Sequence, residues 1–481
     1  MDSRRPPLAP AFRTLPEYVR HWADTTPDRR AFTFVDHPAP HSRGVHRTLT
    51  WRRLDLRVRA LAARLAAEAE PGARVALLCP QGTEYIAGFL AALTAGLVAV
   101  PLYPPNLPGH AARLAGVLAD ATPAVVVTTS RLLEEVRDFC APTPVRVVAV
   151  DQVPDSAAGQ WQPVATDEGA VAYLQYTSGS TRAPAGVEIT HGNVVANARQ
   201  ALTAYGADAT AAFLHQPVRW LRLLAAHPRA VSAAPNFAYD YCASAVTAEQ
   251  KAELRLDGVT ALINGSEPIR PGTVDRFHAA FADRRLAPET HCPSYGLAEA
   301  TVFVSAARSG EPLRRFALDR DALAAGKALP ARPDDPRAVL LAGCGTPAGQ
   351  RLRVTDPVTR AVLSEGEVGE IWVQGPNVGR GYRNRDGDTR HVFGAELADE
   401  AAGPGRWLRT GDLGTVLDGQ LVVTGRLKDL IVVDGRNHYP QDIEATAQDA
   451  HPAVRRDRLA AFAVPGTAGE RVGSWPSTRG P

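Results

Sequence analysis

Residues 173–191 read YLQYTSGSTRAPAGVEITH, and the apolar run Val171–Leu174 leads into a glycine surrounded by hydroxyl residues. These residues are Thr177, Ser178, Gly179, Ser180 and Thr181. Backbone N–H groups and hydroxyls in such a turn can surround phosphate oxygens, which predicts a nucleotide-handling loop. No Gly-Lys-Ser/Thr follows at the Walker A spacing, so the motif does not indicate a P-loop NTPase. A Ser/Thr-rich surface turn remains the alternative for the pentapeptide alone.

Length and composition bound the class of protein. A chain of 481 residues exceeds one ordinary core, so two or more domains are expected, and 45% hydrophobic residues predict a packed globular protein. A formal net charge of +2 argues against a dedicated nucleic-acid binder. The five cysteines are scattered without a CxxC pair, which predicts neither a disulfide framework nor a zinc site. No apolar run reaches the roughly 18 to 20 residues of a membrane span, so we expect a cytoplasmic protein.

Strand and helix patterns alternate along the first part of the chain. Buried-strand patterns such as Arg74–Cys79 and Ala124–Thr128 alternate with helical patterns such as 51–69 and 84–96. This alternation predicts parallel β-α-β units in an open sheet, with ligands bound at the carboxyl ends of the strands. His191 stands at an expected strand-to-helix junction, where a capping role and a catalytic role are both open.

The later part of the chain has a different pattern of predicted secondary structure. After about residue 340 the sequence changes to short strands and turns, which predicts a β-rich subdomain. The fold class predicted is α/β. A large N-terminal domain of doubly wound parallel-type sheets, with the β-rich subdomain, covers residues 1–424, and a small, incomplete α+β C-terminal domain covers 425–481. Residues 305–337 have the composition of a surface insertion.

Further motifs follow the hydroxyl-rich loop in a fixed order. They are Tyr295-Gly296-Leu297-Ala298-Glu299, Leu408-Arg409-Thr410-Gly411-Asp412, Gly425-Arg426-Leu427-Lys428-Asp429 and Gly435-Arg436-Asn437. Together with the loop they resemble the adenylate-forming superfamily of acyl- and aminoacyl-activating ligases. Ordered blocks spread over most of a chain are far more specific than any one motif.

Details of these motifs resemble one branch, the fatty acyl-AMP ligases. Most acyl-CoA ligases have Gly-x-Pro-Lys-Gly after the loop, whereas this chain has Arg182-Ala183-Pro184-Ala185-Gly186. The branch also carries an insertion at the place of residues 305–337, thought to restrain the C-terminal domain and to suppress thioester formation with coenzyme A. The same branch is indicated by Leu102-Tyr103-Pro104-Pro105, Pro235-Asn236-Phe237-Ala238-Tyr239 and Asn264-Gly265-Ser266-Glu267-Pro268.

The resemblance implies an activity and its partners. Such enzymes use ATP and Mg²⁺ to convert a fatty acid into an acyl-adenylate, and load it onto an acyl carrier protein or a carrier domain of a polyketide or peptide synthase. Activation of a carboxylate requires in-line attack on the α-phosphorus, so catalysis is chiefly positioning and electrostatics. The alternatives are a fatty acyl-CoA ligase and a catalytically impaired or non-enzymatic remnant of such a ligase.

Site residues follow from the same resemblance. Thr177 to Thr181 would hold the β- and γ-phosphates, and Glu299 would bind Mg²⁺ as one of the few carboxylates that this ion takes. Thr177, Glu299 and Arg426 are the expected catalytic residues. The adenine slot would be formed by Gly265, Ser266, Glu267, Tyr295 and Gly296, with Tyr295 stacked on the base. Asp412 would accept hydrogen bonds from the ribose hydroxyls, and Arg426 would contact the ribose and phosphate side. Asn236, Phe237 and Tyr239 would line the substrate pocket, and Lys428 would be the hinge.

Each of these residues also has a structural reading. Glu299 alone would be read as a surface acid, Asp412 as a turn residue, Tyr295 as a core aromatic and Arg426 as a solvated cation. Their order and context favour the site.

The chain departs from the family pattern in two places. Ala207–Thr210 leads directly to Phe213-Leu214-His215-Gln216, so a strand and loop that line the acyl tunnel in relatives are missing, which predicts a deletion near 205–212. Loss of a strand from such a sheet would expose backbone groups and apolar faces. Residues 473–481 show neither strand nor helix pattern, and no lysine follows Lys428, whereas the superfamily places its adenylation lysine near the C-terminus. A truncated C-terminal domain is therefore expected.

Overall fold

The structure is a computed structural model in which the chain forms two compact units. Unit 1 comprises residues 1–197 and 377–389, and unit 2 comprises residues 198–376 and 390–481. The residues described are 12–39, 42, 44–107, 109–176, 184–205, 217–399, 404–433, 436–450, 454–466 and 469–478. Among these residues, no helix has the length and apolar character needed to cross a membrane.

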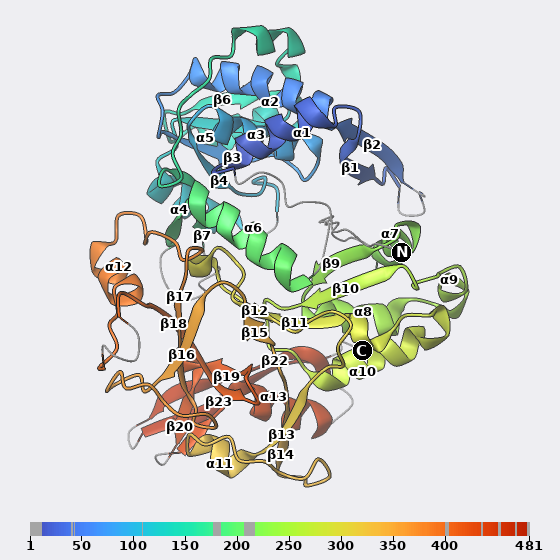
Figure 1. The fold of residues 1–481 in the computed structure, drawn as a ribbon, viewed down its shortest axis with the longest axis vertical. Coiled ribbons are helices and arrows are strands. Elements are labelled where there is room, and N and C mark those ends of the chain that lie inside the picture. Colours follow the sequence, from blue (N-terminus) through green and yellow to red (C-terminus); the bar gives the residue numbers. More distant parts are fainter. Residues whose placement is uncertain are drawn as a thin grey trace. The chain divides into compact units, whose positions relative to one another are not determined.

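A six-stranded sheet forms the centre of unit 1 (Figure 1). Its order is β6 (Arg146–Ala149), β5 (Val125–Thr128), β3 (Arg74–Leu77), β4 (Val98–Pro101), β7 (Val171–Tyr176) and β8 (Gly186–Thr190). The first five strands run parallel, and β8 pairs antiparallel with β7. All four residues of β5 are buried, as expected of a parallel strand covered on both faces. The predicted alternation of strands and helices is confirmed.

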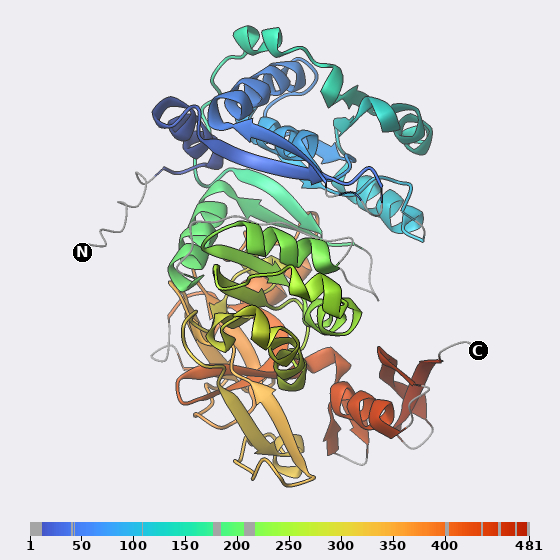
Figure 2. The same ribbon diagram turned by 90° about the vertical axis from the view of Figure 1, so that its right-hand side faces the viewer.

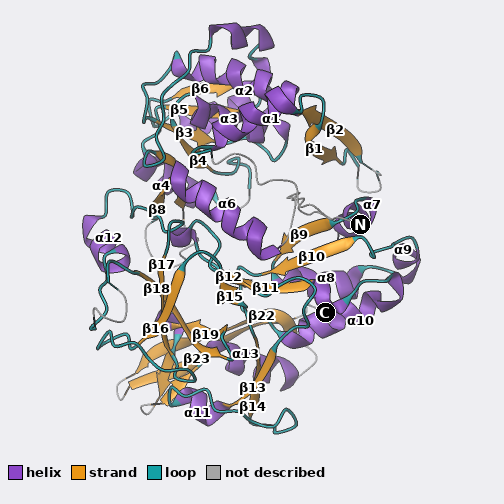
Figure 3. Ribbon diagram, in the orientation of Figure 1, coloured by secondary structure: helices purple, strands orange, loops and turns teal. Residues whose placement is uncertain are grey.

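Helices cover both faces of this sheet, as Figure 3 shows. Leu77 packs into one apolar cluster with residues of α2 and α3, whereas its neighbour Leu78 packs into a second cluster with residues of α4 and α5. Successive residues of a strand point to opposite faces, so the two clusters are the two sides of a doubly wound sheet. The helices are α1 (Leu15–Thr25), α2 (Trp51–Ala66), α3 (Thr83–Thr94), α4 (Ala111–Ala121) and α5 (Leu133–Cys140), and a hairpin is formed by β1 (Arg30–Asp36) and β2 (Val45–Thr50).

A segment from late in the chain completes unit 1. Residues 377–389 lie along β8, where Glu188 N donates to Gly381 O and Arg380 N donates to Glu188 O, both at 2.9 Å. The side chains of Arg380 and Glu188 also form an ion pair of 3.1 Å. The segment therefore places its arginines beside strand β8, which lies about 200 residues earlier in the chain.

A five-stranded sheet opens unit 2. Its order is β15 (Thr346–Pro347), β12 (Ser305–Ala306), β11 (His291–Tyr295), β10 (Val259–Asn264) and β9 (Ala230–Ala234). β9, β10 and β11 are parallel, so their carboxyl ends lie along one edge. Among the described residues, β9 is the edge strand of this sheet on the side opposite β15. The predicted deletion near 205–212 falls largely within residues 206–216, which lie outside the described residues. The helices are α7 (Pro217–Ala226), α8 (Asn236–Ala245), α9 (Ala248–Ala252) and α10 (Pro271–Phe281), while α6 (His191–Tyr205) crosses the division between the units.

The rest of unit 2 is mostly antiparallel β-structure, as expected for the residues after about 340. A four-stranded sheet has the order β16 (Arg351–Thr355), β17 (Gly369–Gln374), β18 (Leu408–Leu417) and β19 (Gln420–Arg426). Along the chain α12 (Asp386–Phe393) lies between β17 and β18. The sheet is followed by β20 (Ile431–Val433), β21 (Arg436–His438), α13 (Pro440–Ala450), β22 (Val454–Gly466) and β23 (Gly469–Thr478). Figure 2 shows α13 beside the β22–β23 hairpin. The boundary at residue 425 stays a prediction.

Two expectations from the sequence need correction. Residues 473–478 were expected to lack strand structure, but they belong to β23, whose backbone pairs with β22 in a hairpin. Backbone pairing needs no particular side-chain pattern, which is why the sequence did not indicate it.

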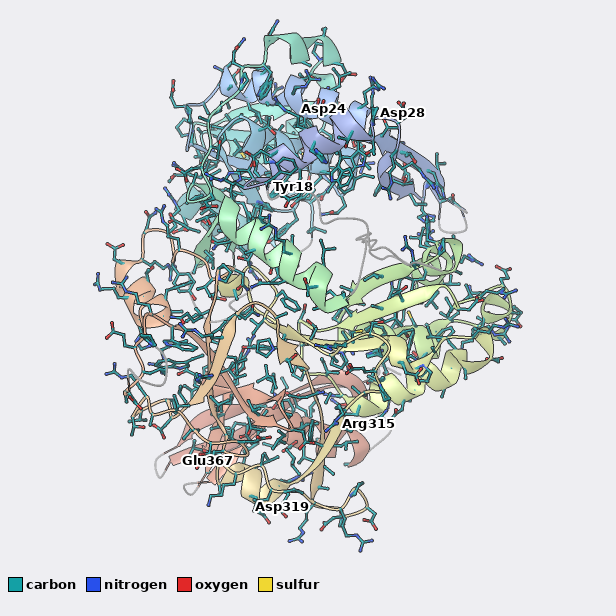
Figure 4. All side chains as sticks on the ribbon, viewed as in Figure 1. Tyr18, Asp24, Asp28, Arg315, Asp319 and Glu367 are labelled. Carbon is teal, nitrogen blue, oxygen red and sulfur yellow. The ribbon has the colours of Figure 1, made fainter. Side chains whose placement is uncertain are left out.

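The segment 305–337 is also more than a surface insertion. Ser305 and Ala306 form β12 inside the five-stranded sheet, where both are buried. Farther along, β13 (Arg315–Asp319) pairs with β14 (Ala338–Ala342), α11 (Arg320–Ala324) follows β13, and Figure 4 labels the two ends of β13. Leu318, Leu323 and Ala328 are buried with Leu413 and Tyr439, so the segment contributes to a core.

The core of unit 2 contains two buried histidines. His278 is 9% exposed and His291 is fully buried, with 5.4 Å between their ring centroids. His291 Nε2 lies 3.0 Å from Asn264 Nδ2, whereas neither ring nitrogen of His278 has a hydrogen-bond partner among the described residues. Burial lowers the pKa of His278 from 6.5 to about 4 and that of His291 to about 3. Both rings are therefore neutral in the folded protein at physiological pH.

These histidines predict a loss of stability in acid. Because the folded protein resists protonation of His278, stability is complete above pH 6.5 and falls as the pH drops toward about 4. Between pH 7 and pH 5 His278 alone should remove about 2 kcal/mol of the free energy of unfolding. His278→Leu should flatten this pH dependence in urea unfolding, whereas His227→Leu, at an exposed histidine, should not. Equal slopes in the two variants would show that burial of His278 is not the cause.

Candidate active site

The predicted site residues of unit 2 meet at the end of β11. Tyr295 is the last residue of that strand, and its hydroxyl donates to Asp412 Oδ2 at 2.7 Å. Asp412 lies in β18, in the four-stranded sheet of unit 2, and is only 7% exposed. Two motifs 117 residues apart are thus joined by one buried hydrogen bond.

Arg426 completes this group from the neighbouring strand. Asp412 and Arg426 stand opposite each other in the pairing of β18 with β19, and Arg426 Nε lies 3.1 Å from Asp412 Oδ1. Antiparallel partners have side chains on the same face, so the register itself forms the ion pair. Each oxygen of the carboxylate accepts one protein donor and keeps lone-pair capacity for another, such as a sugar hydroxyl.

The protonation states of this group suit a hydrogen-bond acceptor. Burial raises the pKa of Asp412, while the Tyr295 hydroxyl and the charge of Arg426 act to lower it. Burial, reinforced by the Asp412 carboxylate, raises the pKa of Tyr295 well above its ordinary value. Tyr295 is therefore a neutral donor, and the ion pair with Arg426 favours the charged form of Asp412.

Glu370 supports the turn that presents Asp412, although it lies outside the motifs quoted from the sequence. Its Oε2 accepts from Arg409 Nη2 at 2.7 Å and from Trp372 Nε1 at 2.9 Å, while its Oε1 accepts from Gly411 N at 3.1 Å. Gly411 has a φ of +70°, a conformation that glycine adopts without strain. A signal was present in the sequence, because Glu370 is the one charged residue of strand β17, where it directly precedes the apolar run Ile371–Val373.

Gly265, Ser266 and Glu267 follow β10 at the same edge of the sheet. A Cβ atom at Gly265 would lie 2.8 Å from Ser294 O, so the backbones approach too closely for a side chain there. Glu267 Oε1 accepts from Phe237 N at 2.6 Å, which fixes the first turn of α8. The structure thus brings this segment beside the end of β11, as the predicted adenine slot requires.

Gly296 and Glu299 lie in the tight turn after Tyr295. Thr301 and Val302 have φ values of +59° and +119°, and a Cβ at Gly296 would lie 1.5 Å from Val302 O. Glu299 is half-buried in the short 3-10 helix Ala298–Ala300. A single carboxylate in this place fits Mg²⁺, which takes one or two carboxylates together with phosphate oxygens. Its role as a metal ligand stays a prediction.

The residues predicted to line a substrate pocket divide into two kinds. Tyr239 is fully buried and its hydroxyl donates to Ile263 O at 2.8 Å, while buried Asn236 accepts from Arg270 N at 3.2 Å. These contacts support a packing role for both. Phe237 is 51% exposed, and of the three only its ring is available to a substrate.

The phosphate-binding role of Thr177 to Thr181 and the hinge role of Lys428 stay predictions. Thr177, Ser178, Gly179, Ser180 and Thr181 lie outside the described residues, between the end of β7 at Tyr176 and the start of β8 at Gly186. Lys428 is exposed in the short 3-10 helix Leu427–Asp429, which joins β19 to β20. An exposed connection between strands is compatible with a hinge.

Comparison with known proteins defines the class. The family model of AMP-binding enzymes matches residues 19–216 and 202–383, and the chain belongs to that family. The chain is 40% identical over 500 residues to the long-chain-fatty-acid–AMP ligase FadD32 of Mycolicibacterium smegmatis, covering 93% of this chain and 79% of that protein. It is 38% identical to FadD26 of Mycobacterium marinum, covering 96% of this chain and 86% of that ligase. Within the family this chain is a fatty acyl-AMP ligase homologue.

Solved structures agree with this assignment. The structure of a fatty acid AMP ligase from Legionella pneumophila matches with a TM-score of 0.82 at 30% sequence identity, covering 98% of this chain and 86% of that chain. A second Legionella pneumophila structure, in complex with acyl adenylate and pyrophosphate, gives the same TM-score and identity over 98% of this chain and 87% of that one. The fold class and the branch expected from the motifs are both confirmed.

The turn after β11 provides a test of the site's geometry. Gly296→Ala places a Cβ against Val302 O and should lower the free energy of unfolding by about 3 kcal/mol, measured by urea denaturation. Gly272→Ala is the matched control, because the nearest atom to its Cβ is the flexible end of Arg276 at 3.5 Å and alanine favours the helix. Similar stabilities of the two variants would mean that the turn relaxes freely.

Proposed function

We propose that this protein uses ATP to convert a fatty acid into an acyl-adenylate and transfers the acyl group to an acyl carrier protein. The observation that carries the proposal is the hydrogen bond between buried Tyr295 and buried Asp412 at the carboxyl end of a parallel strand, with the exposed side chain of Arg426 paired to the same carboxylate. The named activities of the relatives, fatty-acid–AMP ligation and hydroxyphenylalkanoate adenylylation, support the same reaction.

The reaction requires two anions to be held together. A carboxylate oxygen of the fatty acid bonds to the α-phosphorus of ATP as the bond from that phosphorus to the pyrophosphate oxygen breaks. Asp412 would accept the ribose hydroxyls with its remaining lone pairs, and the guanidinium of Arg426 would face the ribose and phosphate side. Thr177 to Thr181 would hold the leaving phosphates. When bound at Glu299, Mg²⁺ would neutralise phosphate charge.

The acyl acceptor is the finer part of the proposal. Leu318, Leu323 and Ala328 of the insertion-like segment are packed with Leu413 of β18 and with Tyr439, which directly precedes α13. The positive charge of Arg320 in α11 lowers the pKa of Asp442 in α13, although burial raises it more, so these two side chains interact across the two elements. This packing supports a segment that restrains the C-terminal region and disfavours thioester formation with coenzyme A.

A second candidate is a catalytically impaired member of the family. The family model matches in two pieces, and these overlap at residues 202–216, where the sequence predicts a deletion. Loss of a stretch that lines the acyl tunnel in relatives would reduce fatty-acid binding while leaving Tyr295 and Asp412 in place. Such a protein would bind ATP but release little pyrophosphate when offered a fatty acid, which separates this candidate from the first.

Nucleotide binding tests the buried carboxylate. Asp412→Ala removes charge-assisted hydrogen bonds worth roughly 1.5 to 3 kcal/mol each, so affinity for a non-hydrolysable ATP analogue should fall at least about tenfold in calorimetric titration. Asp257→Ala, at an exposed aspartate of the same unit, should bind like the wild type. Equal affinity in all three proteins would remove Asp412 from the nucleotide site.

The acceptor is tested by competition. With fatty acid, ATP and Mg²⁺ present, mass spectrometry should detect acyl-adenylate and an acylated phosphopantetheinyl carrier protein, with little acyl-CoA when coenzyme A is offered instead. Robust acyl-CoA formation would favour the acyl-CoA ligase alternative. Absence of any acyl-adenylate, with ATP still bound, would favour the impaired candidate.

A further inference from the structure

Unit 1 contains a pocket that the proposed reaction does not use. The pocket has a volume of about 460 Å³ and opens where β3, β4 and β7 begin, with Arg74, Val98 and Val171 in its lining. In an open parallel sheet the reaction site is expected at the opposite edge, where the strands end. The volume falls within the range of pockets that bind small molecules.

Two cations in this pocket form no ion pair among the described residues, and the carboxylate of Asp167, which also lines the pocket, accepts hydrogen bonds from the N–H groups of Gly169 and Ala170. Arg74 and Arg383 both line it, and neither forms an ion pair with a carboxylate among the described residues. Burial and the positive charge of Arg383 lower the pKa of Arg74, so the two guanidiniums lie near enough to repel each other. Arg380, the third arginine of the lining, is neutralised by Glu188. A bound anion would relieve the repulsion between Arg74 and Arg383.

Buried polar atoms in the same lining also lack partners. Arg383 Nε is buried with no hydrogen-bond acceptor among the described residues. His191 is 2% exposed, lines the pocket, and its Nδ1 likewise has no partner there. Buried polar groups are nearly always hydrogen-bonded, so these two atoms point to a ligand. The backbone N–H groups of His191 and Gly192 are already bonded to Ala170 O and Glu168 O, so the helix terminus is not the binding feature.

The remainder of the lining defines the chemical class of the ligand. Val98, Val164, Val171 and Leu174 form an apolar wall, while Arg74 Nε and Nη2 are held by the carbonyls of Ala121 and Thr122 at 3.0 and 2.9 Å. A rigidly held guanidinium beside an apolar wall suits a carboxylate that carries a short hydrocarbon body. We infer that this pocket is a binding site for a small organic carboxylate, anchored by Arg383 and Arg74 and separate from the adenylation site.

Titration with a short carboxylate tests the site. Isothermal titration with hexanoate is carried out on the whole protein after a non-hydrolysable acyl-adenylate analogue has filled the nucleotide and acyl sites. Hexanoate should bind, the uncharged hexanamide should not, and Arg383→Gln should weaken hexanoate binding at least about tenfold. Arg222→Gln removes the same charge from an exposed arginine of unit 2 and should leave the affinity unchanged.

A second variant separates loss of the binding site from loss of the folded structure. Ala165→Trp alters an exposed residue of the lining, so it should block hexanoate binding without disturbing either arginine or the thermal unfolding midpoint. Wild-type protein that fails to bind hexanoate, or Arg383→Gln that binds like wild type, would overturn the proposal. Phosphate bound as tightly as hexanoate would overturn the assignment of an organic ligand. If the adenylate analogue itself does not bind, the proposed function fails, while the comparison of Arg383→Gln with wild type still decides this site.

Discussion

The buried carboxylate of Asp412 is the constraint on which the site in unit 2 depends. A charged group that is 7% exposed is stable only if it is paired and hydrogen-bonded, and the partners come from two different sheets. Tyr295 is fixed by the end of β11, and Arg426 by the register of β19 on β18. The hydrogen bond between Tyr295 and Asp412 therefore joins the five-stranded sheet to the four-stranded sheet. The same carboxylate retains the capacity to accept from a sugar.

A second layer of contacts keeps this carboxylate in place. Glu370 is 2% exposed and binds the turn before Asp412 through Arg409 and the backbone of Gly411. Removing one partner of such a buried pair lowers the stability of the protein far more than replacing both partners with apolar residues, because it leaves a buried charge without a partner. Glu370 thus joins Trp372 in the sheet interior to the backbone of Gly411, and the next residue, Asp412, accepts the hydrogen bond from Tyr295.

Much of the fold could be predicted from the sequence. The strand patterns at Arg74–Cys79 and Ala124–Thr128 correspond to β3 and β5, because fully buried parallel strands have continuous apolar runs. The convergence of Tyr295 and Asp412 was indicated only by a resemblance to a family, since no local pattern specifies a contact across 117 residues. Glu370 and the joining of residues 377–389 to β8 were missed for the same reason: both are long-range pairings. The β23 strand was missed because backbone hydrogen bonds do not need an apolar alternation.

A crystal structure with a non-hydrolysable acyl-adenylate analogue would show whether the nucleotide binds at the carboxylate of Asp412. We predict that the ribose hydroxyls donate to the carboxylate of Asp412, that the base lies beside Tyr295 and the Gly265–Glu267 segment, and that Arg426 faces the sugar and phosphate. A nucleotide bound elsewhere, or an Asp412 that still contacts only Tyr295 and Arg426 in the complex, would contradict this prediction.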